Sequence, residues 1–474
     1  MTAGTLRIRW RQTLTSLILG AYGAAIALVP ETWQKLALCA PLLAVPVVLW
    51  LLADAARWIP VFLVAAWLLP PLPIAMGNSG PHVAILVAGV GLLAGVLRLN
   101  AWRFHPDWLS TAILALFASF SLSLGFGLIY SGTAVTLAST ARLLLFGISV
   151  YAFFYLRDGP LAPSDAWTTR FVRILFAAAI SSAILACFDF YFQLPAPAGY
   201  GPQFVWLDTG VFRRAQGVFY EASTLGNFCT FFLVMIAASI VTRPSIRPLR
   251  LRTLLVGALP LSFALVLSYS RASLVNLLVA IAVLVLLHRE RIRWVPAAGA
   301  LLAITLVGGA ALTWLFPAFL STYLLRASAT LQFLAEAPNT VLSGRLETWT
   351  RLLDYLASHP EQLLFGIGYK TLPYSTVTGA KMIVDNTYLS VLTEAGLLGL
   401  AALLAMNASI LATSYRAARS GDAMRSFFGT WILCFWAGQV VQMLSADLLT
   451  YWRVLPAYFC VLAIATRRVE DVRK

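Results

Sequence analysis

Two acidic residues lie at the boundaries between polar segments and long apolar runs. Glu221 lies just inside the apolar run 218–241, and Asp385 immediately precedes the run 386–412. A carboxylate at such a boundary can serve as a general base, because burial and a neighbouring arginine set its pKa. For Asp385 the alternative is structural, since an acid before a helix can cap it and meet the positive end of its dipole. We take Asp385 as the first candidate for a catalytic base and Glu221 as the second.

Several arginines stand near the same boundaries, in turns and loops: Arg213, Arg214, Arg271 and Arg345. The planar, permanently charged guanidinium suits phosphate groups, which it binds through two parallel hydrogen bonds. The alternative for any one of them is snorkelling, in which the charged head reaches toward lipid headgroups. Because several gather beside the two longer loops, we favour an anionic ligand.

The composition indicates a membrane protein. The chain has 474 residues, of which 60% are hydrophobic and 11% are charged, whereas soluble domains carry about 25% charged residues. The net charge is +15, but the basic residues lie in short segments between apolar runs and not on one soluble face, which argues against a nucleic-acid partner. The five cysteines lie inside apolar runs without metal-ligand spacing, so we read them as buried thiols.

The apolar runs predict an all-α fold, a polytopic transmembrane helix bundle of about 14 spans of about 20 residues each. The predicted spans are 13–30, 36–53, 58–77, 82–99, 108–130, 133–156, 171–193, 218–241, 253–269, 272–288, 295–315, 386–412, 426–445 and 449–466. Residues 1–315 then hold the first eleven helices, 316–385 form one long loop, and 386–474 hold the last three helices and a tail.

The orientation follows from the basic residues. If the N-terminus is cytoplasmic, most arginines fall in cytoplasmic segments, and the short outer loops hold only Lys35, Arg213, Arg214 and Arg271. This asymmetry matches the positive-inside rule. Both termini are therefore expected in the cytoplasm, and the loops 194–217 and 316–385 on the outer side.

The long loop contains an amphipathic helix by its pattern. From Arg345 to Leu356 the apolar residues recur at helical spacing, at Leu346, Trp349, Leu353 and Leu356. Pro360 is expected to end this helix. Such a helix can lie on the outer membrane–water boundary.

Four segments of the C-terminal half have a characteristic order and spacing. They are Arg214-Ala-Gln-Gly217-Val-Phe-Tyr-Glu221-Ala-Ser223, then Ser270-Arg271-Ala272, then Gly344-Arg345 through Trp349 with His359-Pro360 and Gly366-Ile367-Gly368, and then Asp385-Asn386-Thr387-Tyr388-Leu389 with Glu394-Ala395-Gly396. Together, over roughly residues 210–400, they resemble the O-antigen ligase and polymerase family of polytopic membrane glycosyltransferases.

The resemblance implies glycosyl transfer on the periplasmic face of the bacterial inner membrane. The donor is then a glycan on undecaprenyl pyrophosphate and the acceptor another lipid-linked repeat unit, with membrane lipid, flippase and chain-length regulator proteins as expected partners. The residues expected to bind substrate, the first three around the pyrophosphate, are Arg214, Arg271, Arg345, Arg213, Asn386 and Tyr388. No cofactor is expected if the arginines neutralise the pyrophosphate, although the acids leave a divalent-metal site open.

One departure bears on the reaction. Ligases of this family usually have His-Asn where this chain has Asp385-Asn386, which favours a polymerase of exopolysaccharide, capsule or O-antigen repeat units. A ligase that moves lipid-linked glycan to another acceptor remains an alternative. So does a secondary transporter or glycan flippase, because Arg142, Asp189 and Arg453 fall within predicted spans, although no inverted repeat is evident.

The predicted orientation can be tested with reporter fusions. A fusion after Pro338 should be active in the periplasm, and one after Pro248 in the cytoplasm, because the positive-inside rule places these loops on opposite sides. Alkaline phosphatase and fluorescent-protein activities of the two fusions measure this. The reverse pattern at either site would overturn the orientation.

Overall fold

The computed structural model describes residues 27–72, 80–161, 163–195, 201–207, 210–242, 247–290 and 345–467, with a few residues before 27 and between 310 and 328. The predicted span 295–315 and the loop residues 316–344 therefore lie largely outside the described residues, as does much of the span 13–30.

A helix lies in each predicted span between residues 36 and 466 that the structure describes. The helices are α2 (Thr32–Ala53), α3 (Trp58–Leu68), α4 (Val83–Val96), α5 (Trp108–Ser131), α6 (Thr133–Arg157), α7 (Asp165–Phe192), α8 (Ala222–Val241), α9 (Leu251–Leu267), α10 (Arg271–Leu287), α14 (Arg345–Ser358), α15 (Pro360–Phe365), α16 (Thr387–Ala418), α17 (Ala423–Gln442) and α18 (Leu455–Thr466), with the 3-10 turns η1 (Leu99–Ala101) and η3 (Leu448–Thr450). Among the described residues, α5, α6, α7, α8 and α16 are long and apolar enough to cross a membrane.

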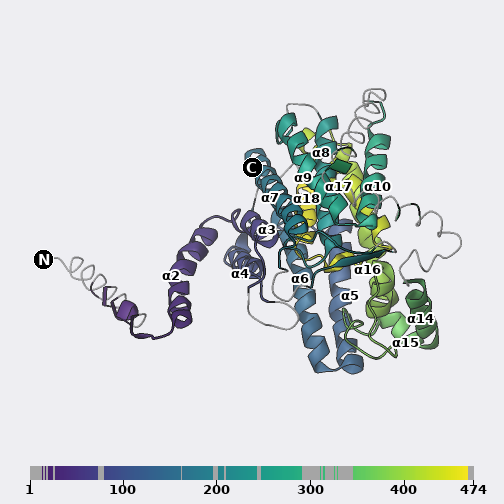
Figure 1. Ribbon diagram of the computed structural model, residues 1–474, viewed down its shortest axis with the longest axis horizontal. Coiled ribbons are helices and arrows are strands. Elements are labelled where there is room, and N and C mark those ends of the chain that lie inside the picture. Colours follow the sequence, from purple (N-terminus) through teal and green to yellow (C-terminus); the bar gives the residue numbers. More distant parts are fainter. Residues whose placement is uncertain are drawn as a thin grey trace.

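The helices form one bundle around α16 and α17. Helix α16 packs against α5 and α17, α17 packs against α10 and α18, and α18 packs against α6, while α2 projects from the side (Figure 1). Aromatic side chains fill the interior. The indole of Trp431 stacks near Phe231, with ring centroids 4.5 Å apart, and its N–H donates to the Phe231 carbonyl at 2.9 Å.

A buried amide network ties α8, α10, α17 and α18 together. The side-chain N–H groups of Asn227 and Asn276 each donate to the amide oxygens of Gln439 and Gln442 at 2.6–2.9 Å. The hydroxyl of Tyr458 donates to Asn227 at 2.6 Å. Hydrogen bonds of this kind hold helices together in an apolar environment, because the hydrophobic effect does not drive helices together there.

Helix α16 is interrupted at Gly396, whose φ of 70° and ψ of −170° lie outside the helical range. The interruption frees the carbonyls of Thr393 and Glu394, which would otherwise accept from residues four places further on. The N–H groups of Ile367 and Gly368 donate to these carbonyls at 3.1 and 3.0 Å. Non-helical backbone in a membrane protein is tolerated where other protein groups satisfy it, so this loop segment completes the broken helix.

Only glycine fits where these two segments meet. A Cβ atom on Gly396 would lie 2.2 Å from the Leu364 carbonyl oxygen, and one on Gly366, with φ of 78°, would lie 2.3 Å from the Glu394 carbonyl oxygen. Two backbones therefore touch directly, and this contact explains Gly366 and Gly396 of the two C-terminal motifs.

The amphipathic helix predicted in the long loop is present as α14, and Pro360 begins the next helix after it. Its apolar face differs from the prediction by one position, because Leu352 is buried whereas Leu353 is 51% exposed. The buried face packs on a small core formed by the loop and the start of α16, together with Ile367, Leu372, Met382, Val384 and Leu389. The structure thus gives this face a protein partner, where the sequence suggested the membrane boundary.

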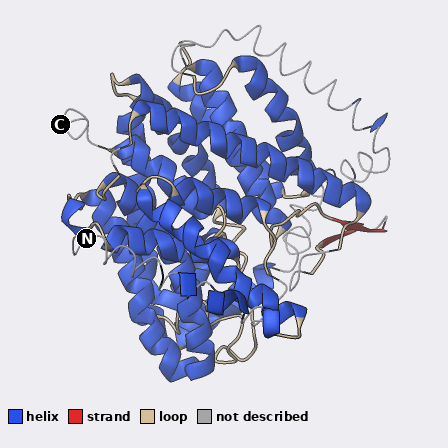
Figure 2. Cartoon of the chain, turned by 90° about the vertical axis from the view of Figure 1, so that its left-hand side faces the viewer, coloured by secondary structure: helices blue, strands red, loops and turns tan. Residues whose placement is uncertain are grey.

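The medium loop adds a detail to the predicted all-α fold. Strands β1 (Phe204–Leu207) and β2 (Gly210–Arg213) form an antiparallel hairpin, which lies at the edge of the bundle (Figure 2). The hairpin ends directly before Arg214, so it sets the direction in which that residue leaves the sheet.

Replacing Gly396 with alanine should destabilise the protein by on the order of 3 kcal/mol, because a positive φ is strained for alanine and the new Cβ overlaps Leu364. Thermal unfolding of purified protein in detergent measures the loss. The matched control is Gly125→Ala in α5, where a Cβ meets nothing within 4 Å. An unfolding temperature for Gly396→Ala equal to that of the control would contradict the backbone contact.

Candidate active site

An ion pair joins the start of α14 to the start of α16. The Nη2 and Nε atoms of Arg345 lie 2.7 and 3.1 Å from the same oxygen, Oδ2, of Asp385. The side chain of Asn386 caps α16 by accepting from the Leu389 N–H at 3.1 Å. The helix cap is therefore Asn386, and Asp385 is available for another role.

Glu221 is the residue before the first turn of α8, and its carboxylate accepts from the Ser223 hydroxyl at 2.9 Å. Burial raises the pKa of Glu221 above its usual value, and the negative charges of Asp385 and Asp447 raise it further, against the opposing effects of Ser223 and Arg214. A glutamate with a raised pKa is a stronger base than an exposed one and holds its proton at a higher pH.

Arg214 follows β2 and reaches the turn between α9 and α10, where its Nε donates to the Ser268 carbonyl at 2.8 Å. Burial lowers the pKa of Arg214, whereas Tyr451 and Glu221 raise it. Its other electrostatic neighbours are Arg345 and Asp385. We call this group the arginine–carboxylate cluster: Arg214, Glu221, Arg345, Asp385 and Tyr451.

Tyr451 lies buried between η3 and α18, and contributes the hydroxyl of the cluster. Burial raises its pKa well above the usual value, and Glu221 adds to this. Ser223 interacts with the side chains of both Tyr451 and Glu221. The hydroxyl of Tyr451 and the carboxylate of Glu221 thus both contact Ser223.

A second charged group adjoins the cluster and was not predicted from the sequence. The ammonium of Lys370 binds Asp447, lies 3.5 Å from Glu394 Oε2 and donates to the Ser390 hydroxyl at 3.3 Å. Burial opposes the charge on Lys370, but Asp447 and Glu394 outweigh it and raise the pKa of the lysine above its usual range. The sequence feature that could have indicated this group is a lysine two residues after the Gly366-Ile367-Gly368 motif, on the predicted outer side.

Arg213 points away from the cluster, although it precedes Arg214 in the chain. Its Nη2 donates to Asp189 at 2.8 Å and to the Leu194 carbonyl at 2.8 Å, and the other oxygen of Asp189 accepts from the Gly217 N–H at 3.1 Å. The structure therefore gives Arg213 a buried partner and separates it from the other predicted substrate-binding arginines.

The remaining predicted residues lie around the same turns. Arg271 begins α10, three residues after the Ser268 carbonyl that Arg214 contacts. Asn386 is occupied as a helix cap, and the Tyr388 hydroxyl donates to the Val440 carbonyl of α17 at 2.9 Å. The contacts of these last two residues hold α16 in place.

Comparison with known families matches residues 254–404 to the family described as O-antigen ligase. The match covers about a third of the chain. The family resemblance of the sequence motifs is thereby confirmed over these residues, and it implies O-antigen ligase or polymerase-type activity on a lipid-linked glycan. A search of the curated proteins finds no match.

The matched residues supply only part of the arginine–carboxylate cluster. Arg345 and Asp385 lie inside them, as does Lys370 of the adjoining charged group, whereas Arg214, Glu221 and Tyr451 lie outside them. The medium loop and the turn before α18 therefore supply the rest of the cluster. Among the described residues, no group of three or more His, Cys, Asp or Glu side chains is arranged to hold a metal ion.

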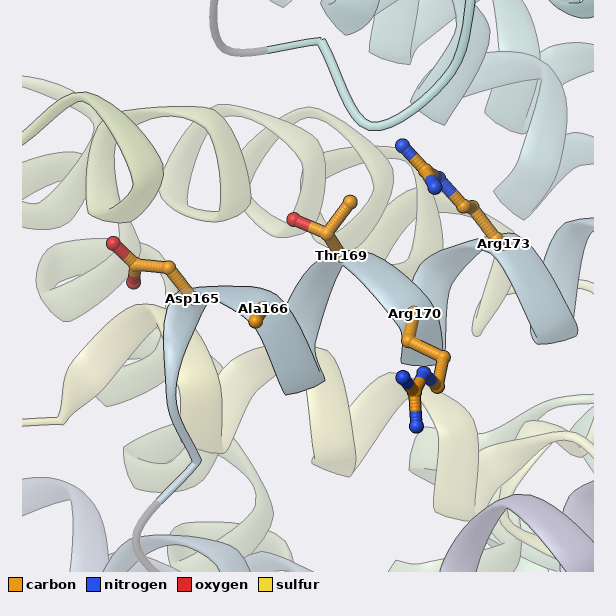
Figure 3. A pocket seen from close by; sticks show the side chains of 5 residues that line it. All are labelled: Asp165, Ala166, Thr169, Arg170 and Arg173. Carbon is orange, nitrogen blue, oxygen red and sulfur yellow. The ribbon is translucent and has the colours of Figure 1, made fainter.

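The surface also has an open hollow of about 400 Å³ at the start of α7, lined by Asp165, Ala166, Thr169, Arg170 and Arg173 (Figure 3). It lies at the opposite end of α7 from Asp189, which binds Arg213. The hollow and Asp189 thus lie at opposite ends of α7, and we do not include the hollow in the site.

Because the side chains of Arg213 and Asp189 are both largely buried, Arg213→Gln should leave an unpaired carboxylate and lower the free energy of unfolding by about 3 kcal/mol. The double variant Arg213→Gln/Asp189→Asn should recover most of this loss. Thermal unfolding in detergent measures both. The control is Arg351→Gln, which breaks an exposed pair with Glu347 and should have little effect. No difference between Arg213→Gln and this control would contradict the structural role.

Proposed function

We propose that the chain is a periplasmic-face glycosyltransferase that polymerises undecaprenyl-pyrophosphate-linked repeat units into an exopolysaccharide, capsule or O-antigen. The observation that carries this proposal is the Arg345–Asp385 ion pair inside a cluster with Arg214 and Glu221. It sets groups suited to a pyrophosphate leaving group beside groups suited to accepting a proton.

The reaction follows from these groups. An acceptor hydroxyl attacks the anomeric carbon of the donor, the new glycosidic bond forms, and the bond from that carbon to the pyrophosphate breaks. The electron pair leaves with the lipid pyrophosphate, whose developing charge is stabilised by preorganised cations; Arg214, Arg345 and Arg271 take this part. The hydroxyl proton passes to a carboxylate, with Asp385 as the first candidate and Glu221 as the second.

The ion pair also suggests how the base is released. Asp385 and a phosphate oxygen are alternative ligands for the Arg345 guanidinium, and Asp385 uses only one of its oxygens for this contact. When the pyrophosphate takes over Arg345, Asp385 loses its partner and can accept a proton. Arrival of the donor then both neutralises the cation and frees the base.

We place the protein in the bacterial inner membrane with both termini in the cytoplasm. Residues 1–315 and 386–474 then supply the membrane helices, and 316–385 the periplasmic loop domain. Flippase and chain-length regulator proteins would supply repeat units and set polymer length. Asn386 and Tyr388 support this site by holding α16, and Arg213 by fixing the hairpin before Arg214.

A ligase is the second candidate, because the matched family is described as O-antigen ligase. The same cluster can transfer the glycan of one lipid carrier to a different acceptor. Purified protein supplied with lipid-linked repeat units alone distinguishes the two, since a polymerase lengthens the glycan without any further acceptor.

Asp385→Asn should reduce polymer formation by about 10²- to 10⁴-fold, because asparagine cannot accept the proton. Folding should be retained, since Asn386 provides the cap of α16. Polymer length on gels, with purified protein in liposomes and lipid-linked repeat units, gives the activity. Glu347→Gln, an exposed acid on α14, is the control and should be near wild type. Full activity of Asp385→Asn would transfer the role of base to Glu221.

A further inference from the structure

Two tyrosines expose their rings beside the arginine–carboxylate cluster. Tyr220 directly precedes Glu221 and is 50% exposed, and Tyr374 is 38% exposed. Tyr220 interacts electrostatically with both Glu221 and Tyr374. Both tyrosines lie in connecting segments and not within a helix.

The ring of Tyr374 is held in place by the protein. The segment that carries it is anchored through Lys370, whose ammonium binds Asp447 and Ser390. The guanidinium of Arg142, on α6, lies over the Tyr374 ring at 4.1 Å from its centroid and 3.5 Å from the Lys370 carbonyl oxygen. An arginine over one face orients the ring and leaves the opposite face for another ligand.

These surroundings select the chemistry of the ligand. An exposed aromatic ring offers a negative π face and, in tyrosine, a hydroxyl at its edge. Sugars are complementary, since one face of a pyranose carries C–H groups and its rim carries hydroxyls. A neighbouring carboxylate such as Glu221 accepts hydrogen bonds from those hydroxyls. A lipid chain would use the ring face but leave these polar groups unmatched.

We propose that Tyr220 and Tyr374 form a glycan-binding platform that stacks the acceptor sugar beside Glu221. The inference rests on the proposed function, because the acceptor is the substrate whose hydroxyl must approach a carboxylate. The platform positions the sugar, while Arg214 and Arg345 hold the pyrophosphate of the donor.

Kinetics separate stacking from other roles. Tyr374→Ala and Tyr220→Ala should each raise the KM for the acceptor about tenfold and leave the KM for the donor within about twofold, the effect of losing one aromatic contact. Tyr374→Phe and Tyr220→Phe keep the ring and should restore the acceptor KM. The matched control is Tyr415→Ala: Tyr415 is 49% exposed and has Arg419 at 5.7 Å, but lies near the far end of α16. An unchanged acceptor KM in both alanine variants of the platform would overturn the inference.

A binding measurement tests the platform independently of turnover. The probe is the free oligosaccharide released by mild acid from the lipid-linked repeat unit of the source cell. Saturation-transfer NMR with the purified full chain in detergent should show transfer to the sugar C–H protons, and the Tyr220→Ala/Tyr374→Ala variant should lose it. Absent transfer in the wild type, or equal transfer in both proteins, would overturn the platform. A wild type that binds the oligosaccharide but forms no glycosidic bond would instead count against the proposed function alone.

Discussion

The interruption of α16 at Gly396 is the constraint on which the site depends. Two backbone carbonyls released inside the bundle must be satisfied by protein, and the segment 366–368 satisfies them. That contact fixes the position of Lys370, two residues further along, against α16 and the turn before α18. The loop domain, the first half of α16 and the turn at Asp447 are thus joined by a break in one helix.

The charges in this region are arranged so that almost every acid faces a cation. Arg345 faces Asp385, and Lys370 faces both Asp447 and Glu394. Removing charged groups from water is costly unless they are paired, and burial raises the pKa of Glu221. A pyrophosphate that enters such a site must take a cation from an acid. Substrate binding and the release of a base are therefore the same event in the proposed reaction.

The sequence predicted the elements better than the contacts between them. Apolar run length located the helices, and the motif order led to the family. The sequence could not distinguish the roles of adjacent residues. Arg213 and Arg214 looked equivalent, yet Arg213 binds Asp189 on α7 and Arg214 enters the cluster. The reason is that the hairpin turns successive side chains in different directions. Capping was the alternative role considered for Asp385, whereas the structure gives the cap of α16 to Asn386. The Lys370–Asp447 pair joins residues 77 positions apart, and no local pattern encodes such a contact.

The helix ends suggest why the cluster is suited to an anion. Three helices begin beside a residue of the cluster. Helix α8 begins directly after Glu221, and α14 begins at Arg345. Helix α16 begins two residues after Asp385, with the capping residue Asn386 between them. Helix α10 begins three residues after the carbonyl that Arg214 contacts. Each N-terminus presents partial positive charge. The arginines add to this field, and in the proposed reaction the pyrophosphate replaces Asp385 as the anion that Arg345 binds.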